Sequence, residues 1–393
     1  MRKDRLVLGL SMNIILLGIV SFLTDMSTEM IVPLLPFFLV GLGATYWLIG
    51  VIEGVAESIS SFLKLAFGIY SDKLRKKKAF VISGYSISNL VKPLLALATS
   101  PMHVLAIKVT DRIGKGIRTT PRDALIADAS KAQDRGKAFG LHRALDTSGA
   151  VVGPLIALIV LIAFGCAGTL NNIGIYRVIF AISAIPGIAA ILVLSFVKES
   201  KKITRKKYTL SLSKFPKNFR IFVVGVGIFS LGNFSIAFFL LRSEQILSIG
   251  ICGDVALYVF MNLTYALLSF PFGLVADRIG RKNILLSGFM IFSIVMLLFA
   301  FANSLAVIIL GFLLFGVFMA MTDGVIRAMG SVMVPQDVCG SALGIINLIT
   351  SITIFPANFI AGILWDAFGS CFAFLLSASL GIIASLLIGL FVR

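Results

Sequence analysis

The chain is a succession of long apolar runs separated by short loops that are rich in lysine and arginine. The runs approach or exceed the roughly 20 residues that a helix needs to cross the hydrocarbon core of a bilayer. Only 13% of the 393 residues are charged, whereas a soluble domain carries roughly 25%. A soluble fold could not bury this much apolar surface, because its surface-to-volume ratio limits its core. The sequence therefore predicts an all-α integral membrane protein in contact with the lipid bilayer.

Charged loops and turn residues divide the sequence into twelve predicted transmembrane helices. An even number of helices puts both termini on one side of the membrane, and the positive loops make that side cytoplasmic. We therefore expect a multi-pass protein of the cell membrane. The predicted spans are residues 8–38, 44–70, 79–99, 102–120, 138–163, 176–197, 219–244, 253–275, 283–302, 304–327, 340–364 and 370–391.

The net charge of +17 raises the question of nucleic-acid binding. The basic residues lie in short loops between spans, and this bias orients a membrane protein, so we expect no nucleic-acid partner. The sequence has no GxxxxGKS or GxxxxGKT phosphate loop, no GxSxG and no HExxH. It therefore does not indicate an ATP-driven pump or an enzyme, and we expect no cofactor and no metal site.

One polar segment, residues 198–218, is the longest in the chain and carries eight lysine and arginine residues. Such a segment is typical of a cytoplasmic linker that lies near anionic headgroups. It divides six predicted helices from six. The predicted domains are an N-terminal bundle, residues 1–197, and a C-terminal bundle, residues 219–393.

Two short patterns recur at offsets of 205 and 204 residues. One is a Gly–Asp pair four residues apart, and the other is a pair of glycines with the same spacing. Two landmarks with nearly one offset indicate two homologous six-helix halves, an architecture known among secondary transporters. The recurring residues are Gly68 with Asp72 and then Gly273 with Asp277, and Gly136 with Gly140 and then Gly340 with Gly344.

The loop GLVADRIGRKN, which follows the eighth predicted span, resembles the loop signature of the major facilitator superfamily. The first copy departs from this signature at Arg75, where the second copy has Gly280. The run DRIGKGIRTTPRDALIAD resembles a prokaryotic branch of mostly uncharacterised transporters in that superfamily. The resemblance implies twelve helices in two pseudo-symmetric six-helix bundles. It also implies a transporter of a small molecule, not an enzyme, and we expect it to be a monomer.

Two further resemblances bear on ion coupling. Gly140, Gly149, Gly153 and Pro154 have the spacing of the superfamily's antiporter-associated motif, although its last glycine is replaced here. The glycines predict close helix packing, and the proline permits a bend. The resemblance adds a role in blocking proton leak or in selecting antiport over symport. Arg112 in the fourth span resembles an arginine that is implicated in proton coupling.

The signature loops suggest a conformational latch, meaning a contact that forms in one transport state and breaks in another. In the family picture the loop carboxylate docks on a basic residue and on the start of a facing helix. The glycines are expected to permit a tight interhelical turn. The alternative is a static turn whose basic residues only set topology. The expected latch residues are Gly68, Asp72, Gly273, Asp277, Arg278, Arg281 and Arg118.

Ionisable residues inside the predicted spans are the main functional signal, and most of them lie in the first half. Each costs about 2.5–3.5 kcal/mol at the centre of a span, so they must face one another or water. Three roles compete: proton coupling, binding of a charged substrate, and structural pairing between helices. The candidate coupling and cavity residues are Asp25, Glu29, Glu53, Glu57, Lys92, Asp111, Arg112, Lys115, Arg143, Asp146, Asn233, Asn262 and Asp323.

These observations predict a secondary active transporter that works by alternating access, with substrate bound near the midplane between two halves. We expect a proton gradient to drive it through the acids of the first half. Export by proton antiport is the leading interpretation, because of the resemblance in the fifth span. Uptake by symport or uniport, and a membrane-embedded enzyme, are the alternatives. The sequence does not identify the substrate.

Overall fold

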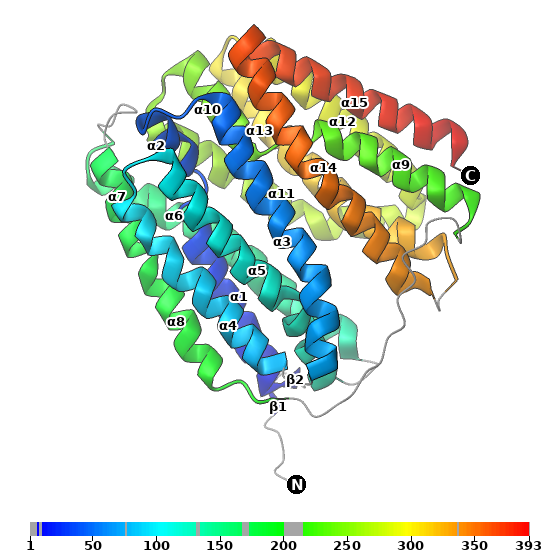
Figure 1. The fold of residues 1–393 in the computed structure, drawn as a ribbon. Coiled ribbons are helices and arrows are strands. Elements are labelled where there is room, and N and C mark those ends of the chain that lie inside the picture. The colour runs from blue at the N-terminus through cyan, green and yellow to red at the C-terminus, as the bar shows by residue number, and fades with distance from the viewer. Residues whose placement is uncertain are drawn as a thin grey trace. The chain divides into compact units, whose positions relative to one another are not determined.

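A computed structural model describes residues 6–7, 10–74, 77–130, 134–166, 173–199, 215–335 and 338–392. This part of the chain is helical (Figure 1), apart from a short hairpin of strands β1 (Leu6–Val7) and β2 (Leu10–Ser11). The all-α fold predicted from the sequence is thus confirmed.

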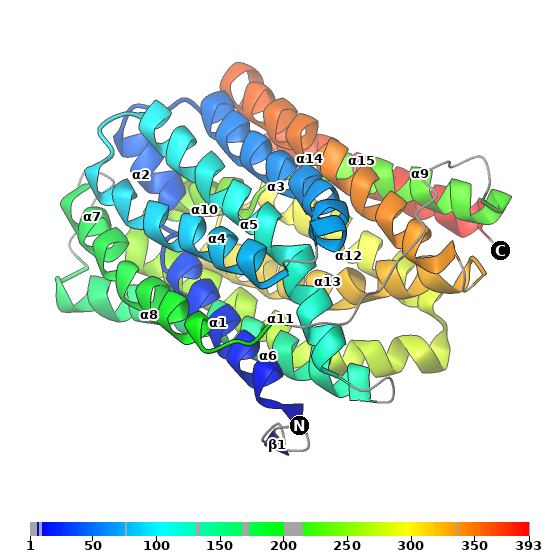
Figure 2. The same ribbon diagram turned by 60° about the horizontal axis from the view of Figure 1, so that its bottom comes forward.

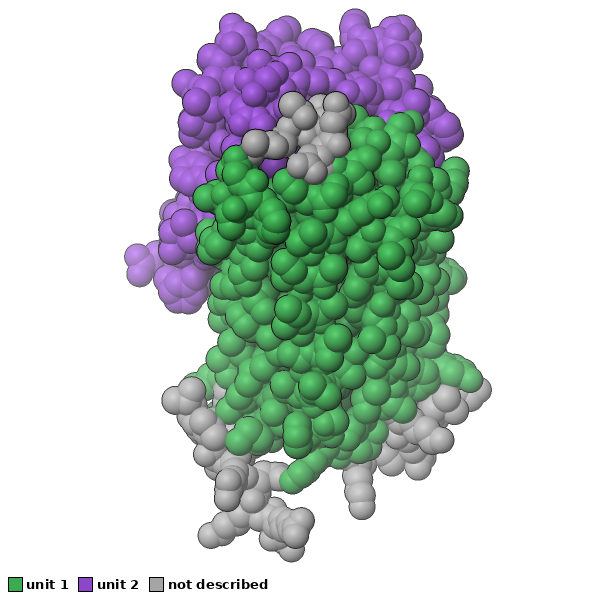
Figure 3. Space-filling model, turned by 90° about the vertical axis from the view of Figure 1, so that its left-hand side faces the viewer, with its two compact units in different colours: residues 1–43, 59–206 green, residues 44–58, 207–393 purple. Residues whose placement is uncertain are grey.

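The chain forms two compact units, which Figure 3 shows in different colours. Unit 1 comprises residues 1–43 and 59–206, and unit 2 comprises residues 44–58 and 207–393. The later boundary falls inside the predicted linker, of which residues 200–214 lie outside the described part. The assignment of residues 44–58 to the second unit was not predicted, and it divides one continuous helix between the two units.

In unit 1, helix α1 packs against α6 and α8, and α4 packs against α5 (Figures 1 and 2). Its elements are α1 (Met12–Glu29), α2 (Leu35–Gly41), the second part of α3 (Tyr46–Leu74), α4 (Lys77–Val91), the 3-10 helix η1 (Lys92–Leu97), α5 (Pro101–Ala129), α6 (Arg135–Ala163), α7 (Ile173–Ile182) and α8 (Ala184–Ser195).

In unit 2, α12 packs against α13 and α15, and α9 packs against α14 and α15. Phenylalanine rings fill the space between these helices; Phe229, for example, stacks on Phe289 with centroids 4.0 Å apart. The elements are α9 (Lys217–Gly232), α10 (Ile236–Leu247), α11 (Gly250–Ile279), α12 (Arg281–Ala300), α13 (Leu305–Val332), α14 (Cys339–Phe368) and α15 (Ser370–Phe391).

Within the described ranges, 11 helical segments are long and apolar enough to cross a membrane. Helix α5 is not one of them, although its 29 residues exceed the length that a span needs. Its face carries Lys108, Asp111, Arg112 and further charges, which lower its hydropathy. The most charged predicted span is therefore a long helix, extending to Ala129 rather than to residue 120.

Four predicted spans are not continuous helices. Residues 30–34 separate α1 from α2, and the 3-10 helix η1 follows α4 directly. Ser183 separates α7 from α8, and residues 233–235 separate α9 from α10. Proline occupies the first two breaks, and it removes a backbone donor and clashes with the preceding turn. The first, third, sixth and seventh predicted spans are therefore each built from two helical pieces.

Two glycines of α6 let that helix lie directly against α1. A Cβ atom on Gly153 would lie 2.5 Å from the Met26 carbonyl oxygen, and one on Gly149 would meet the carbonyl of Phe22. Pro154 lies inside α6, which continues to Ala163. A Cβ on Gly140 would have nothing within 4 Å. The expectation of close packing is therefore wrong for Gly140, because its side of α6 faces no neighbouring helix in the described residues.

This difference gives a matched pair of variants within one predicted motif. Gly149→Leu should lower the thermal unfolding temperature, because overpacking a tight interface costs about 1–3 kcal/mol or more. Gly140→Leu should leave it nearly unchanged. Scanning fluorimetry of the two purified variants compares them directly. Equal destabilisation by both substitutions would contradict the packing seen between α1 and α6.

Candidate functional site

Two acids predicted from the sequence come together inside unit 1. The carboxyl groups of Asp25, on α1, and Asp146, on α6, lie in hydrogen-bonding contact. Ser21 donates to Asp146 Oδ1 at 2.5 Å, and Arg143 Nη1 donates to Oδ2 at 3.3 Å. Two carboxylates repel at this range, whereas a protonated one can donate to its neighbour. We refer to Asp25 and Asp146 as the carboxyl pair.

Helix α5 supplies the positive charge beside the carboxyl pair. Arg122 Nη1 lies 3.4 Å from the Ser21 hydroxyl, while its Nε and Nη2 donate to Asp123 Oδ1 at 3.0 and 2.9 Å. Lys115 is near enough to attract Asp25. The carboxyl pair therefore belongs to a network across α1, α5 and α6, in which a change of protonation alters the balance of several charges.

A second polar cluster lies between α1, α4 and α5. Lys92, which is 3% exposed, donates from Nζ to Thr28 Oγ1 at 2.9 Å and to the Thr24 carbonyl at 3.4 Å. Ser88 donates to Asp111, and Arg112 Nε lies 3.7 Å from the other Asp111 oxygen. Three predicted charges, Lys92, Asp111 and Arg112, are thus held by neutral groups and by one another.

The close approach of α4 and α5 makes this cluster possible. A Cβ on Gly84 would lie 2.6 Å from the Gly114 carbonyl oxygen, and one on Gly114 would lie 2.6 Å from the Gly84 carbonyl. With no side chain between the two backbones, the short Ser88 side chain reaches Asp111 across the interface. Small residues favour such contacts between helices in membranes.

The structure does not gather all of the predicted first-half acids. Glu29 lies at the end of α1, close enough to Asp25 to repel it. Glu53 and Glu57 lie in the part of α3 that belongs to unit 2. They lie four residues apart, so they share a face of that helix.

In unit 2 the predicted polar residues are separate. Asp323, on α13, accepts from Tyr265 Oη at 2.8 Å and from Arg327 at 3.3 Å. Asn262, on α11, is buried, and its Nδ2 has no partner within the described residues. Asn233 is the C-terminal cap of α9, so its predicted place inside a helix is wrong. Helix α9 ends at this point, and Ser235 is the N-cap of the next helix, α10.

The second signature loop turns at a different glycine from the one expected. Gly273 lies within α11 with nothing within 4 Å of a Cβ, whereas Gly280 has φ +99° between α11 and α12. Positive φ favours glycine, so the tight turn belongs to Gly280. Arg281 donates from Nε and Nη2 to Asp277 Oδ1 at 3.1 and 2.8 Å. The side chains of Gly68 and Asp72, in the first copy, lie outside the described residues.

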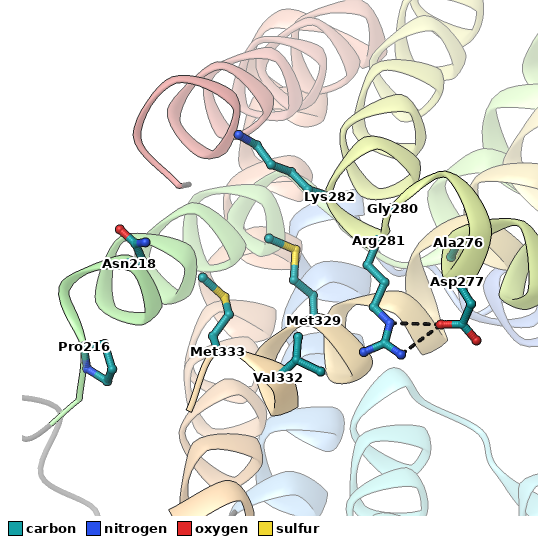
Figure 4. Close-up of a pocket in the computed structure, with 10 residues that line it drawn as sticks. All are labelled: Pro216, Asn218, Ala276, Asp277, Gly280, Arg281, Lys282, Met329, Val332 and Met333. Carbon is teal, nitrogen blue, oxygen red and sulfur yellow. Dashed lines mark hydrogen bonds and ion pairs between the residues drawn. The ribbon is translucent and has the colours of Figure 1, made fainter. Parts of the chain in front are cut away.

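Figure 4 shows a cavity of about 530 Å³ beside this loop. Its basic groups are already engaged: Arg281 binds Asp277, and Lys282 Nζ donates to the Gly389 and Val392 carbonyls at 2.9 and 2.5 Å. The cavity therefore shows no polar group that is set aside for a ligand. It is lined by Pro216, Asn218, Ala276, Asp277, Gly280, Arg281, Lys282, Met329, Val332 and Met333.

The other two predicted latch arginines do not join this loop's ion pair. Arg278 is exposed at the end of α11. Arg118 lies on α5 in unit 1, where its guanidinium carbon is 4.3 Å from the centre of the Tyr85 ring. Among the described residues, Arg281 is thus the predicted basic partner that binds Asp277 of the second signature loop.

The start of α3 is bound to the end of α14 within unit 2. Asp366 Oδ2 accepts from the backbone N–H of Trp47 at 2.7 Å, and Oδ1 accepts from that of Tyr46 at 3.2 Å. A carboxylate at a helix N-terminus satisfies free amides and opposes the helix dipole. The Tyr46 ring also stacks on Trp365, with centroids 5.0 Å apart.

Three glycines make the contact between α3 and α14 close. A Cβ on Gly54 would lie 2.9 Å from Phe355 Cα, and one on Gly362 would lie 2.6 Å from Trp47 Cα. A Cβ on Gly50 would meet the Asn358 carbonyl. The first part of α3 therefore runs along α14 at nearly backbone contact (Figures 1 and 2). We refer to this interface as the α3–α14 contact.

The second part of the same helix is bound within unit 1. A Cβ on Gly116, of α5, would lie 2.6 Å from Leu63 Cβ, and Thr120 Oγ1 donates to the Lys64 carbonyl at 2.7 Å. Because α3 is one continuous helix, any rocking of one unit against the other must bend it or open one of its two interfaces.

Several residues that complete these arrangements were not predicted. Ser21, Ser88 and Tyr265 each bind a predicted acid, and Asp366 binds the start of α3. A spacing signal existed for two of them. Ser21 precedes Asp25 by four residues on α1, and Ser88, on α4, precedes Lys92, the first residue of η1, by four. No local pattern distinguished Tyr265 or Asp366, because their partners are distant in the sequence.

In the described ranges, no group of three or more His, Cys, Asp or Glu residues is placed to hold a metal ion. The described polar groups can bind protons and pair charges.

The chain is similar to membrane transporters along most of its length. Residues 17–261 and 222–393 match the sequence model of the Major Facilitator Superfamily. An uncharacterised MFS-type transporter of Methanocaldococcus jannaschii is 38% identical over 386 residues, which cover 96% of this chain and 94% of that protein. The multi-drug resistance efflux pump PmrA of Streptococcus pneumoniae is 26% identical over 275 residues, which cover 69% of this chain and 64% of that protein. The crystal structure of a D-xylose–proton symporter superposes with a TM-score of 0.79 at 16% identity, covering 97% of each chain.

Proposed function

The chain belongs to the major facilitator superfamily, and we propose that it works as a proton-coupled exporter of the cell membrane. It is an integral, multi-pass membrane protein and a transporter of small molecules. Exchange of substrate against protons, cytoplasmic termini and a monomeric state are parts of the proposal. Substrate would bind between two halves that rock to expose it to each side in turn.

The carboxyl pair is the observation that supports proton coupling. Asp25 and Asp146 come from different helices and meet inside a unit whose helices cross a membrane. Ionisable groups held at membrane depth are commonly parts of proton or substrate pathways. Loss of the shared proton would leave two adjacent negative charges, which Arg143 and Lys115 must then balance. Proton release would therefore change contacts on three helices.

Two observations favour export over uptake. Gly149 and Gly153 of the antiporter-like motif lie in close contact with α1, and Gly149 lies directly beside Asp25. The relative from Streptococcus pneumoniae is named as an efflux pump. The xylose symporter shares the fold alone at its level of identity, so it gives no support to symport here.

Purified protein in liposomes that contain a pH-sensitive dye tests the proposal. Compounds that bind the protein in a thermal-shift screen are added outside liposomes whose interior is acidic. Antiport predicts that the interior becomes more alkaline as substrate enters and protons leave, whereas symport predicts further acidification. Substrate entry without any change in internal pH would reject proton coupling, and chemical conversion of the compound would indicate an enzyme.

We also propose that the Asp277–Arg281 ion pair is the latch of the second signature loop. Asp277→Asn should shift the balance between inward-facing and outward-facing states by roughly 1.4- to fivefold, because exposed ion pairs contribute about 0.2–1 kcal/mol. Reactivity of engineered thiols on the two membrane sides measures this balance. Arg278→Gln is the control, since Arg278 is the exposed neighbour of this pair. An unchanged balance in Asp277→Asn would reject the latch.

A further inference from the structure

Arg118 of α5 is a buried cation whose hydrogen-bonding capacity is largely unused. The residue is 5% exposed, and its Nε and Nη1 have no hydrogen-bond partner in the part of the chain that the structure describes. Its guanidinium lies against the face of Tyr85 at 4.3 Å from the ring centre. An aromatic face attracts a cation but accepts none of the in-plane N–H bonds of a guanidinium.

The carboxylates nearest along α5 and in its surroundings are engaged elsewhere. Asp111 accepts from Ser88 and faces Arg112. Asp123 accepts two N–H bonds from Arg122, and Asp128 accepts from Lys77 at 2.7 Å. Asp146 is shared by Ser21, Arg143 and Asp25. Arg118 therefore stands apart from the arginines whose donors are bound to acids.

The positive charge at this site also exceeds the negative charge. Arg118 and Lys92 both act on Asp111, together with Arg112. Asp25 also acts on Lys92, so two carboxylates face these three cations. A charged group that is buried without a hydrogen-bonded counterion is strongly unfavourable, so this arrangement calls for an anion from outside the described network.

The packing around Arg118 fixes where such an anion would bind. A Cβ on Gly84 would lie 2.7 Å from Arg118 Cβ and 2.8 Å from its backbone nitrogen, so the base of the side chain is held against α4. The fully buried Tyr85 ring supports one face of the guanidinium. Nε and Nη1 are enclosed by neighbouring atoms but have no acceptor among the described residues, and their planar fork matches the oxygens of a carboxylate or phosphoryl group.

We propose that the transported molecule carries an anionic oxygen group, a carboxylate or a phosphoryl group, which binds the Arg118 guanidinium. This assignment rests on the proposed function as a transporter and names the chemical class of its substrate. Lys115, one turn before Arg118 on α5 and partly exposed, adds a second positive charge on the same helical stripe.

Binding of simple anions to the purified full-length protein tests this assignment. The probes are sodium phosphate, succinate and citrate, with choline chloride as the cationic comparison, all at matched ionic strength. At least one anion should raise the unfolding temperature of the wild-type protein, and calorimetry then gives its Kd. Arg118→Gln should weaken that binding at least tenfold, about the effect of losing one charge-assisted hydrogen bond.

Two further variants keep the test decisive. Arg177→Gln is the matched control, because Arg177 is a partly buried arginine of unit 1 that donates to the Ala98 carbonyl at 2.9 Å; it should bind the anion as the wild type does. Arg118→Lys keeps the charge but loses the planar fork, so it should fold and still bind more weakly. If Arg118→Gln does not fold, the Arg118→Lys variant decides.

The proposal is overturned if none of the three anions stabilises the wild-type protein, or if Arg118→Lys and Arg118→Gln bind as tightly as the wild type. It is also overturned if Asp72→Asn abolishes anion binding to the same extent as Arg118→Gln, since Arg118 would then serve the latch. Binding is measured without a membrane or gradient, so a failure of proton coupling in liposomes leaves this result unaffected.

Discussion

Asp25→Asn abolishes transport driven by a pH gradient while substrate exchange across the liposome membrane continues. An asparagine cannot release a proton, but its amide can still donate to Asp146 in place of the protonated carboxyl group. The network that includes Ser21 and Arg143 is therefore preserved in shape. We expect pH-driven flux to fall to the level of liposomes without protein.

The dye-loaded liposomes described above measure transport driven by the pH gradient. Exchange of labelled substrate at equal pH on both sides measures substrate exchange across the membrane. Asp134→Asn is the matched control: Asp134 precedes α6, and its side chain makes no capping hydrogen bond. Its coupled transport should equal that of the wild type. If Asp25→Asn and Asp146→Asn both retain full coupled transport, the carboxyl pair has no part in the mechanism.

Gly50→Leu traps the transporter with the α3–α14 contact open. The Cβ of any larger residue would meet the Asn358 carbonyl, so a leucine must push the two helices apart. Overpacking of this kind costs about 1–3 kcal/mol, which shifts a two-state equilibrium by roughly 5- to 150-fold. Transport should fall accordingly if the transport cycle needs this contact to form.

Intrinsic fluorescence reports this contact without any label, since the chain has two tryptophans and both lie in it. Trp365 is 4% exposed and stacks on Tyr46, whereas Trp47 is 43% exposed. Opening the contact should therefore shift the emission to longer wavelength, chiefly through Trp365.

Two variants accompany Gly50→Leu. Asp366→Ala, which removes the acceptor of two N–H groups at the start of α3, should move the emission in the same direction to a smaller extent. Gly344→Leu, at a glycine of α14 with nothing within 4 Å, should leave the spectrum and the transport rate unchanged. Wild-type emission and wild-type transport in Gly50→Leu would show that α3 and α14 do not separate during the cycle.

Helical spacing predicted which candidate residues share a helix face, but not which unit that face belongs to. Arg143 and Asp146 are three residues apart on α6 and form an ion pair, as their shared face implies. Glu53 and Glu57 also share a face, but that face belongs to a stretch of α3 held in unit 2. Spacing fixes which residues lie side by side on one helix, and it carries no information about which helix lies opposite.

Among the glycines, too, the sequence predicted some helix contacts and missed others. Gly149 and Gly153 are four residues apart and both meet α1, whereas Gly140, nine residues before Gly149, lies on the opposite side of α6 and meets nothing within 4 Å. The contact between Gly84 and Gly114, which sets the distance from α4 to α5, was not predicted. Close approach depends on two helices at once, so one sequence pattern cannot specify it.

By itself, the sequence determined that this protein is a helical membrane transporter with charges turned away from lipid. Hydrophobicity and the cost of burying charge act on each span separately, so they can be read from local composition. Only the tertiary structure decided that Asp25 meets Asp146, that Asp366 caps α3, and that Arg118 keeps unused donors. These are contacts between residues far apart in the chain, and they follow from how the helices pack, which no local pattern encodes.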